Sequence, residues 1–175
     1  IDDLRAVAEA GARLVVLVNP HNPTGAVWTE EDLRDLADVV IERDLLVVAD
    51  EIFGELTLDG RRHVPFASLG PEVAARTITV TSAAKSHNLA GVRCAVAHVG
   101  ASAALDPFRA VPLSQIGQVS NLGFLATIAA WDDDDRWLDA FRSAVEERRD
   151  QAAGLLDDHL PQVTHVPPEA GVLSW

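Results

Sequence analysis

Two short, uninterrupted apolar runs place the strongest limit on what this chain can fold into. They cover residues 14–18 and 45–49, and a stretch with apolar residues on one helical face separates them. A continuous apolar run of this length is typical of a strand buried on both faces, as found in parallel sheets. Two such strands joined by a helix predict an α/β fold.

The rest of the chain continues this alternation. Thr29, followed by three acidic residues, is a good helix start, because the hydroxyl caps the first turn and acids favour the N-terminal dipole. The patterns predict a mainly parallel sheet with helices on both faces. Helices are expected over residues 2–10, 29–43, 101–110, 114–131 and 137–159, and further strands over residues 76–81, 92–99 and from Gly171 onward.

The long helix from about residue 137 divides the chain into two unequal parts. We expect residues 1–132 to form the central part of a large domain, and residues 133–175 to form a bridging helix and the start of a small C-terminal domain. The chain contains no Met, and it stops in what reads as a strand, so we expect an internal piece of a longer protein.

Charge and cysteine content exclude several classes of partner. The net charge of −13 argues against binding to nucleic acids or anionic membranes, which requires clustered Lys and Arg. Cys94, the single cysteine, cannot form an internal disulfide and fits a reducing compartment. The apolar runs are far shorter than the roughly 20 residues of a membrane helix. We therefore expect a cytoplasmic protein without membrane or nucleic-acid partners.

Four consecutive acids, residues 132–135, raise the question of a metal site. Consecutive residues at a helix start point in different directions and do not converge on one ion. We interpret the run as a solvated helix start and expect no metal site.

The residues with chemical potential follow three predicted strands. Lys85 is the only lysine of the chain, and it lies in a loop of small residues between two strands. Ligands of parallel α/β sheets gather at the carboxyl ends of the strands. Three loops leave such ends, residues 19–25, 50–53 and 82–93, and their polar residues are Asn22, Asp50, Ser82, Lys85 and Arg93.

This set matches the needs of pyridoxal phosphate. The amine can form a Schiff base with the aldehyde, and a carboxylate can keep the pyridine nitrogen protonated. The amide can donate to the ring phenolate, and the hydroxyl and guanidinium can hold the phosphate. Each also has a structural interpretation: Asn22 as a turn residue, Asp50 as a cap, Ser82 as a loop hydroxyl and Arg93 in a surface ion pair.

The chain resembles the fold-type I, class I/II aminotransferase superfamily, because three of its motifs occur in the order typical of that family. The details are most similar to its cystathionine β-lyase-like branch, the carbon–sulfur lyases related to the maltose-regulon modulator. The residues that carry the resemblance are Asn19-Pro20-His21-Asn22-Pro23-Thr24-Gly25, Ala49-Asp50-Glu51-Ile52, Pro65-Phe66-Ala67-Ser68-Leu69, Ser82, Lys85, Asn88-Leu89-Ala90-Gly91 and Arg93.

The resemblance implies a role for each strand-end residue. Lys85 would be the catalytic Schiff-base lysine and proton shuttle, and Asp50 would pair with the pyridinium nitrogen. Asn22 would donate to the phenolate oxygen, while Ser82 and Arg93 would bind the phosphate. The resemblance further implies a homodimer acting on a small amino-acid substrate, with residues 1–132 belonging to the cofactor-binding large domain.

Three activities remain open on these residues. The leading one is a carbon–sulfur β-lyase that converts cystathionine or an S-substituted cysteine to thiol, pyruvate and ammonia. The alternatives are a class I/II aminotransferase and a regulatory domain that keeps the cofactor but has lost turnover. A truncated segment without function is also open, and the same five residues serve both the lyase and the aminotransferase.

Two positions depart from the family pattern. Phe53 stands where many relatives have Tyr or His, so Asn22 becomes the main donor to the phenolate oxygen from this segment. With fewer donors that oxygen is more basic, and we expect the Schiff base to hold its proton more tightly. Ala84 replaces a phosphate-binding Ser. His21 and His87 are interpreted as structural or rim residues.

The resemblance also implies parts that this chain lacks. The helix start under the phosphate and the ring-stacking aromatic residue would lie before Ile1, and the arginine for the substrate carboxylate would lie beyond Trp175. We therefore expect the 175 residues alone to bind the cofactor poorly.

Overall fold

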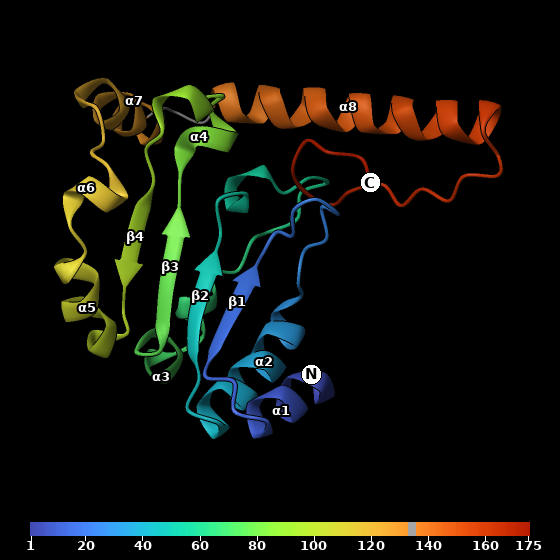
Figure 1. The fold of residues 1–175 in the computed structure, drawn as a ribbon. Coiled ribbons are helices and arrows are strands. Elements are labelled where there is room, and N and C mark those ends of the chain that lie inside the picture. The colour runs from blue at the N-terminus through green and yellow to red at the C-terminus, as the bar shows by residue number, and fades with distance from the viewer. Residues whose placement is uncertain (133–135) are drawn as a thin grey trace.

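The computed structural model describes residues 1–132 and 136–175. Its regular elements alternate between helices and strands (Figure 1). In chain order they are α1 (Asp2–Glu9), β1 (Leu14–Val18), α2 (Glu30–Glu42), β2 (Leu46–Asp50), η1 (Gly54–Leu56), η2 (Phe66–Leu69), α3 (Pro71–Ala74), β3 (Thr77–Thr81), α4 (Ala83–Ser86), η3 (Ala90–Val92), β4 (Val96–Val99), η4 (Ser102–Ala104), α5 (Leu105–Ala110), α6 (Leu113–Ile116), α7 (Asn121–Trp131) and α8 (Arg136–His159), where η denotes a short 3-10 helix.

The described strands form one sheet in the order β1-β2-β3-β4. β1, β2 and β3 are parallel, and β4 runs antiparallel to β3. The three parallel strands end at the same edge of the sheet (Figure 1). The predicted mainly parallel α/β fold is confirmed.

The main core lies between one face of β1 and β2 and the helices α1, α2 and α3. Leu33, Leu36 and Val40 of α2 are buried there against Leu17 and Val47 of the sheet. The predicted start of α2 is confirmed, because Thr29 Oγ1 accepts from Asp32 N at 3.1 Å and the Asp32 carboxylate accepts from Thr29 N. This core anchors the edge at which the three loops meet.

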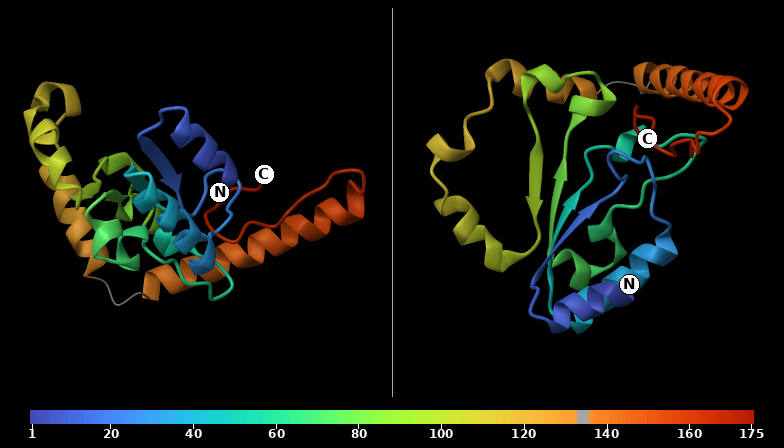
Figure 2. Two further views of the ribbon diagram at one scale, coloured as in Figure 1. Left: turned by 90° about the horizontal axis from the view of Figure 1, so that it is seen from below. Right: turned by 45° about the vertical axis from the view of Figure 1, so that its right-hand side comes forward.

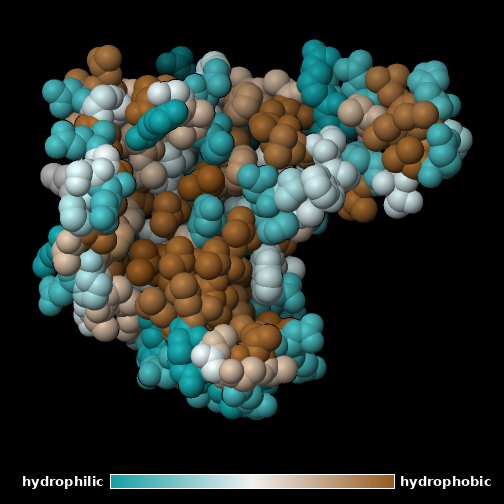
Figure 3. All heavy atoms as spheres, viewed as in Figure 1, coloured by the Kyte–Doolittle hydropathy of each residue, from teal (hydrophilic) through white to brown (hydrophobic). Residues whose placement is uncertain are grey.

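The opposite face of β1 is open, contrary to the expectation that this strand is buried on both faces. Leu14 and Val16 point there and are 52% and 64% exposed. An apolar patch covers the middle of this face (Figure 3). The difference arises because α1 and α2 both pack on the other side of β1, while α5, α6 and α7 lie beyond the β4 edge (Figure 1).

Several predicted elements are shorter than expected. The strand predicted over residues 92–99 covers only Val96–Val99, because Arg93 takes a left-handed conformation with φ of 51°. The helix predicted over residues 114–131 is two helices, α6 and α7, separated at Gly117, which has φ of 78°. Instead of the strand from Gly171, an isolated bridge joins Ala170 to Thr57. The acidic run interpreted as a helix start falls largely on residues 133–135, outside the described residues.

Helix α8 passes over the edge where the parallel strands end and then projects beyond the sheet (Figures 1 and 2). After α8 the chain turns back, and Glu169 N donates to Gly25 O in the loop that follows β1. Residues 168–173 therefore return to the strand-end edge. Across the described part of the chain, every helix is too short or too polar to cross a membrane.

Candidate active site

The three loops that carry the predicted site residues are held together by backbone hydrogen bonds beyond the ends of the strands. Asn19 N donates to Asp50 O at 3.0 Å, which extends the β1–β2 pairing. Glu51 N donates to Val80 O at 2.9 Å, which extends the β2–β3 pairing. The residues that follow β1, β2 and β3 therefore start from adjacent points on one edge.

Ser82 connects the end of β3 to α4, the short helix that carries Lys85. Its hydroxyl accepts from Ala84 N at 3.1 Å and donates to Cys94 O at 2.6 Å. Ser82 is 5% exposed, and its hydroxyl proton is used within the protein. Ser82 thus caps α4, and it also fastens the Arg93–Cys94 backbone beside this helix.

Lys85 lies above the aromatic ring of Phe53. The Nζ atom is 5.7 Å from the ring centroid, within the range of a cation–π contact. Within the described residues, Nζ has no hydrogen-bond acceptor and no ion-pair partner. A half-buried ammonium held only by a ring face keeps all of its hydrogens available to a ligand.

Asp50 and Asn22 also keep polar atoms that the described chain does not use. Asp50 Oδ1 accepts from Ile52 N at 3.2 Å, which is the turn-capping role, and the second carboxylate oxygen has no partner there. Asn22 is exposed within the turn that Gly25 N closes on His21 O at 2.8 Å. The capping role of Asp50 leaves one oxygen for a ligand.

Arg93 lies beside the start of α4 because its neighbour Cys94 accepts the Ser82 hydroxyl. Its side chain is exposed and forms no ion pair with any other described residue. Of the predicted residues, Lys85, Asp50, Asn22 and Arg93 therefore present free polar groups, whereas Ser82 does not.

The sequence patterns missed a buried acid behind the Asp50 turn. Glu51 is 6% exposed, and its Oε1 accepts from Phe66 N at 2.8 Å. Its Oε2 lies 3.2 Å from Nε2 of His63. These contacts join the turn after β2 to the segment that enters η2. In the sequence, the only indication of this buried acid was its position directly after Asp50.

The sequence patterns also missed a group of residues that supports α4, the helix that carries Lys85. Ser86 is fully buried, and its hydroxyl donates to Glu55 Oε2 at 2.5 Å. From α8, the indole N–H of Trp137 donates to Ser86 O at 3.3 Å, and Arg142 Nε donates to Glu55 O at 2.9 Å. Helix α8 therefore holds both the lysine-bearing helix and the stretch after Phe53.

Residues 168–173, here called the wall, close one side of the site. A small cleft lies between the wall and the loop after β1, and Asn22 and Phe53 line it together with Gly171, Val172 and Leu173. Gly171 has φ of 78°, and a Cβ there would lie 3.5 Å from the Phe53 ring. The wall thus touches the ring over which Lys85 lies.

This arrangement suits a ligand with an electrophilic carbonyl, a hydrogen-bond acceptor and an anionic group. The Lys85 amine can attack the carbonyl, Asp50 can hold a cationic nitrogen, and Arg93 can bind a phosphate. Across the described residues, no three His, Cys, Asp or Glu side chains are placed to hold a metal ion.

Comparisons with known proteins agree with this chemistry. A family model described as aminotransferase class I and II matches residues 1–175. Cystathionine beta-lyase PatB of Bacillus subtilis (strain 168) is 31% identical over 170 residues, which are 97% of this chain and 44% of that protein.

Two solved structures share the fold over nearly the whole chain. The pyridoxal-phosphate-bound C-S lyase from Staphylococcus hominis has a TM-score of 0.88 and 30% identity, over 99% of this chain and 44% of that one. N-succinyldiaminopimelate aminotransferase from Mycobacterium tuberculosis has a TM-score of 0.82 and 32% identity, over 97% of this chain and 43% of that one. The chain spans less than half the length of the curated relatives it matches.

Proposed function

Because the chain belongs to the aminotransferase class I and II family, we propose that it supplies the catalytic lysine and part of the cofactor site of a pyridoxal-phosphate-dependent carbon–sulfur β-lyase. The observation that carries this proposal is the position of Lys85. Its ammonium lies over Phe53, without a polar partner in the described residues, beside the loops that hold Asp50 and Asn22.

The residues at the strand ends fit pyridoxal phosphate. Lys85 would bind the aldehyde carbon, the free Asp50 oxygen would accept from the pyridinium N–H, and Asn22 would donate to the phenolate oxygen. Arg93 would hold the phosphate. Ser82 would join it only by turning its hydroxyl proton away from Cys94 O.

When bound, the cofactor delocalises the electron pair left at the substrate Cα after its proton is removed. The Lys85 amine would be the base that takes this proton, because it would lie beside the substrate Cα when it is not bonded to the aldehyde carbon. Asp50 would accept a hydrogen bond from the ring N–H and so would favour this delocalisation.

The proposed substrate is cystathionine or another S-substituted cysteine. The Cα–H and Cβ–S bonds break, and the sulfur leaves as a thiol that carries one proton. The remaining aminoacrylate takes up one water molecule and yields pyruvate and ammonia. Support for this substrate class comes from the similarity to a cystathionine beta-lyase and to a C-S lyase.

The second candidate is an aminotransferase. The likeness to N-succinyldiaminopimelate aminotransferase, at a TM-score of 0.82, favours it. The same Lys85 would then return the proton to a cofactor carbon instead of allowing the β-substituent to leave, so Lys85, Asp50 and Asn22 serve both reactions.

The product formed by the full-length protein tests these candidates. The protein is loaded with pyridoxal phosphate and supplied with S-methyl-cysteine, with and without 2-oxoglutarate. Thiol, pyruvate and ammonia formed without a keto acid are the expected result. Turnover only with a keto acid assigns the aminotransferase, and cofactor binding without either reaction assigns the regulatory domain.

We also propose that residues 1–132 belong to the cofactor-binding large domain, that residues 133–175 begin the small domain, and that the full-length protein is a homodimer. The dimer proposal is supported by α7, where Leu122, Phe124 and Leu125 are 77%, 59% and 60% exposed. Apolar side chains grouped on one helix favour a protein contact. Sedimentation equilibrium of the full-length protein is expected to give twice the monomer mass, and a monomer mass would refute the dimer.

A further inference from the structure

Arg149 of α8 binds three parts of the chain at once. Its guanidinium forms a bidentate pair with the Asp59 carboxylate, at 2.6 and 2.8 Å, and its Nε lies 2.8 Å from Asp150 Oδ1. The same guanidinium donates to Pro168 O at 3.2 Å. The Arg149 side chain is only 10% exposed, which is low for an arginine on a projecting helix.

Asp59 is held from both its carboxylate and its amide. It has φ of 55° at the turn after η1, and Asp59 N donates to Glu146 Oε1 at 2.7 Å. The hydrogen bond from Arg149 lowers the pKa of the Asp59 carboxyl below its ordinary value, and the same bond raises the pKa of Arg149. Glu146 and Arg149, which lie about one helical turn apart on α8, therefore both bind the loop that contains Asp59.

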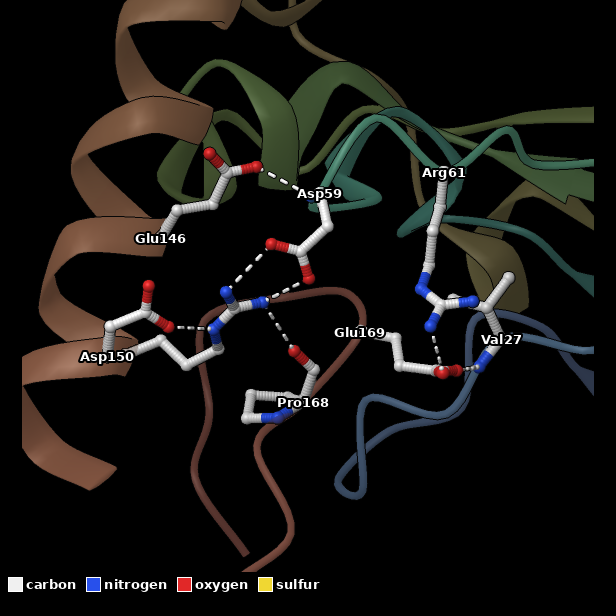
Figure 4. Close-up of polar contacts among 8 residues, drawn as sticks. Val27, Asp59, Arg61, Glu146, Asp150, Pro168 and Glu169 are labelled. Atoms are coloured by element: carbon white, nitrogen blue, oxygen red, sulfur yellow. Dashed lines mark hydrogen bonds and ion pairs between the residues drawn. The ribbon is translucent and has the colours of Figure 1, made fainter. Parts of the chain in front are cut away.

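The first residues of the wall lie between this turn and the loop after β1. Leu58 N donates to Glu169 O and Gly171 N donates to Leu56 O, both at 2.9 Å. On the other side, Glu169 N donates to Gly25 O at 3.0 Å, and Val27 N donates to Glu169 Oε2, also at 3.0 Å. From the turn after η1, Arg61 adds an ion pair to Glu169 at 2.7 Å (Figure 4).

The wall packs against the loop after β1 without space for a further atom. A Cβ at Gly25 would lie 2.4 Å from Pro168 Cβ and 2.6 Å from Ala170 O. Any shift of the wall must therefore occur away from the loop, toward α8. The four hydrogen bonds above oppose such a shift, and so does the Arg149 guanidinium, which Asp59 fixes in place beside Pro168 O.

We propose that Arg149 is a positioning residue that holds the wall against the Asn22 loop and thereby sets the size of the substrate side chain that the site admits. The role in substrate selection rests on the proposed function, whereas the positioning role rests on the contacts described above. The wall presents Ala170, Val172 and Leu173 to the cleft beside Phe53, which favours an apolar group on the substrate sulfur. We expect the site to accept small S-alkyl groups and to exclude bulky ones while Arg149 is in place.

The test uses the full-length protein with Arg149→Met, and Arg148→Met is the matched control. Arg148 is the preceding residue, and its side chain is 70% exposed. Hydrogen exchange followed by mass spectrometry reports on the amides of Leu58 and Gly171, which bond to the wall or belong to it. We expect faster exchange at both amides in Arg149→Met and no change in Arg148→Met.

The second readout is the ratio of kcat/KM for S-methyl-cysteine to that for S-benzyl-cysteine. We expect Arg149→Met to raise KM for S-methyl-cysteine about tenfold with kcat little changed, because a wall displaced by about an ångström weakens binding. The ratio should fall about tenfold as the looser wall admits the benzyl group. Arg149→Lys, which keeps one ion pair, should lie between.

Two results would overturn the inference. One is equal exchange in Arg149→Met and Arg148→Met; the other is faster exchange with an unchanged substrate ratio, which would make Arg149 merely structural. If Arg149→Met does not fold, hydrogen exchange and the substrate ratio are measured on Asp59→Asn instead. This variant alters the half-exposed partner of the same ion pair. If the wild type releases no thiol, the proposed function fails, and the exchange data alone then decide on the positioning role.

Discussion

The site has two sides that are held in different ways. Asn22, Asp50 and Lys85, the strand-end residues, follow parallel strands whose pairing continues past their ends and whose far face is a buried core. The wall follows a turn outside the sheet and forms one isolated bridge with Thr57. It is held by single hydrogen bonds, among them the one from Arg149 to Pro168 O, and by the ion pair of Glu169 with Arg61.

The difference separates fixed geometry from adjustable geometry. A strand end backed by leucines moves only if the core is disrupted, and core disruption costs several kcal/mol. A segment outside the core, held by single hydrogen bonds and a partly exposed ion pair, depends on contacts that contribute about 1 kcal/mol each. The amine proposed to be catalytic is therefore positioned by the strand ends, whereas the wall proposed to meet the substrate side chain can be shifted by a few substitutions.

The largest effect is expected from the strand-end side. Lys85→Ala in the full-length protein should reduce turnover by roughly 10⁴-fold or more, because it removes both the nucleophile and the base. It should also abolish the visible absorbance of the lysine-linked cofactor. Arg62→Ala, an exposed residue on the same chain, is the control. Retention of that absorbance in Lys85→Ala would refute the assignment.

The core behind the strand ends provides the next effect. Leu36 is 3% exposed between α2 and the sheet, so Leu36→Ala should lower the free energy of unfolding by about 2–5 kcal/mol. Asp38→Ala on the exposed face of the same helix should change it by less than about 0.5 kcal/mol. Urea denaturation measures both, and equal effects would show that this core does not carry the stability of the edge.

The packing of the wall on the loop can be tested with two glycines. Gly25 and Gly60 have similar left-handed φ values of 69° and 67°, but only Gly25 has the wall within 4 Å of its missing Cβ. Both alanine variants bear the same backbone strain, so the additional loss in Gly25→Ala measures the clash, about 1–3 kcal/mol. Equal melting temperatures for Gly25→Ala and Gly60→Ala would contradict the close contact.

The smallest effect is expected from the ion pair between Asp59 and Arg149, which supports the wall. Asp59→Asn should destabilise the protein by about 1 kcal/mol or less at pH 7, because Asp59 is half exposed. The folded-state pKa of Asp59 is lowered, so the pair contributes fully above the unfolded pKa of about 3.9 and is lost as pH falls through the folded pKa.

Denaturation of wild type and Asp59→Asn at pH 7 and at about pH 3 checks this sign. The difference between the two proteins should shrink at the lower pH. Asp38→Asn, an exposed carboxylate outside the wall, should show no such dependence. A difference that grows as pH falls would contradict the assigned role of the pair.

Much of the sheet side could be predicted from local pattern. The apolar runs of β1 and β2 and the cap at Thr29 identified their elements nearly to the residue. The strand-end rule then placed Asn22, Asp50, Lys85 and Arg93 on adjacent loops. The hydroxyl of Ser82 was the exception, because only the folded chain shows that Cys94 O uses its proton.

The sequence by itself determined the parallel sheet, the order of the strand-end residues and the single amine available for chemistry. These follow from periodicity and residue type, which act over a few neighbouring positions. The tertiary structure alone decided that β1 leaves one face open and that Glu169 meets Val27, 142 residues away. Hydropathy patterns describe each element relative to its own axis, so they carry no information on which distant segment closes the site.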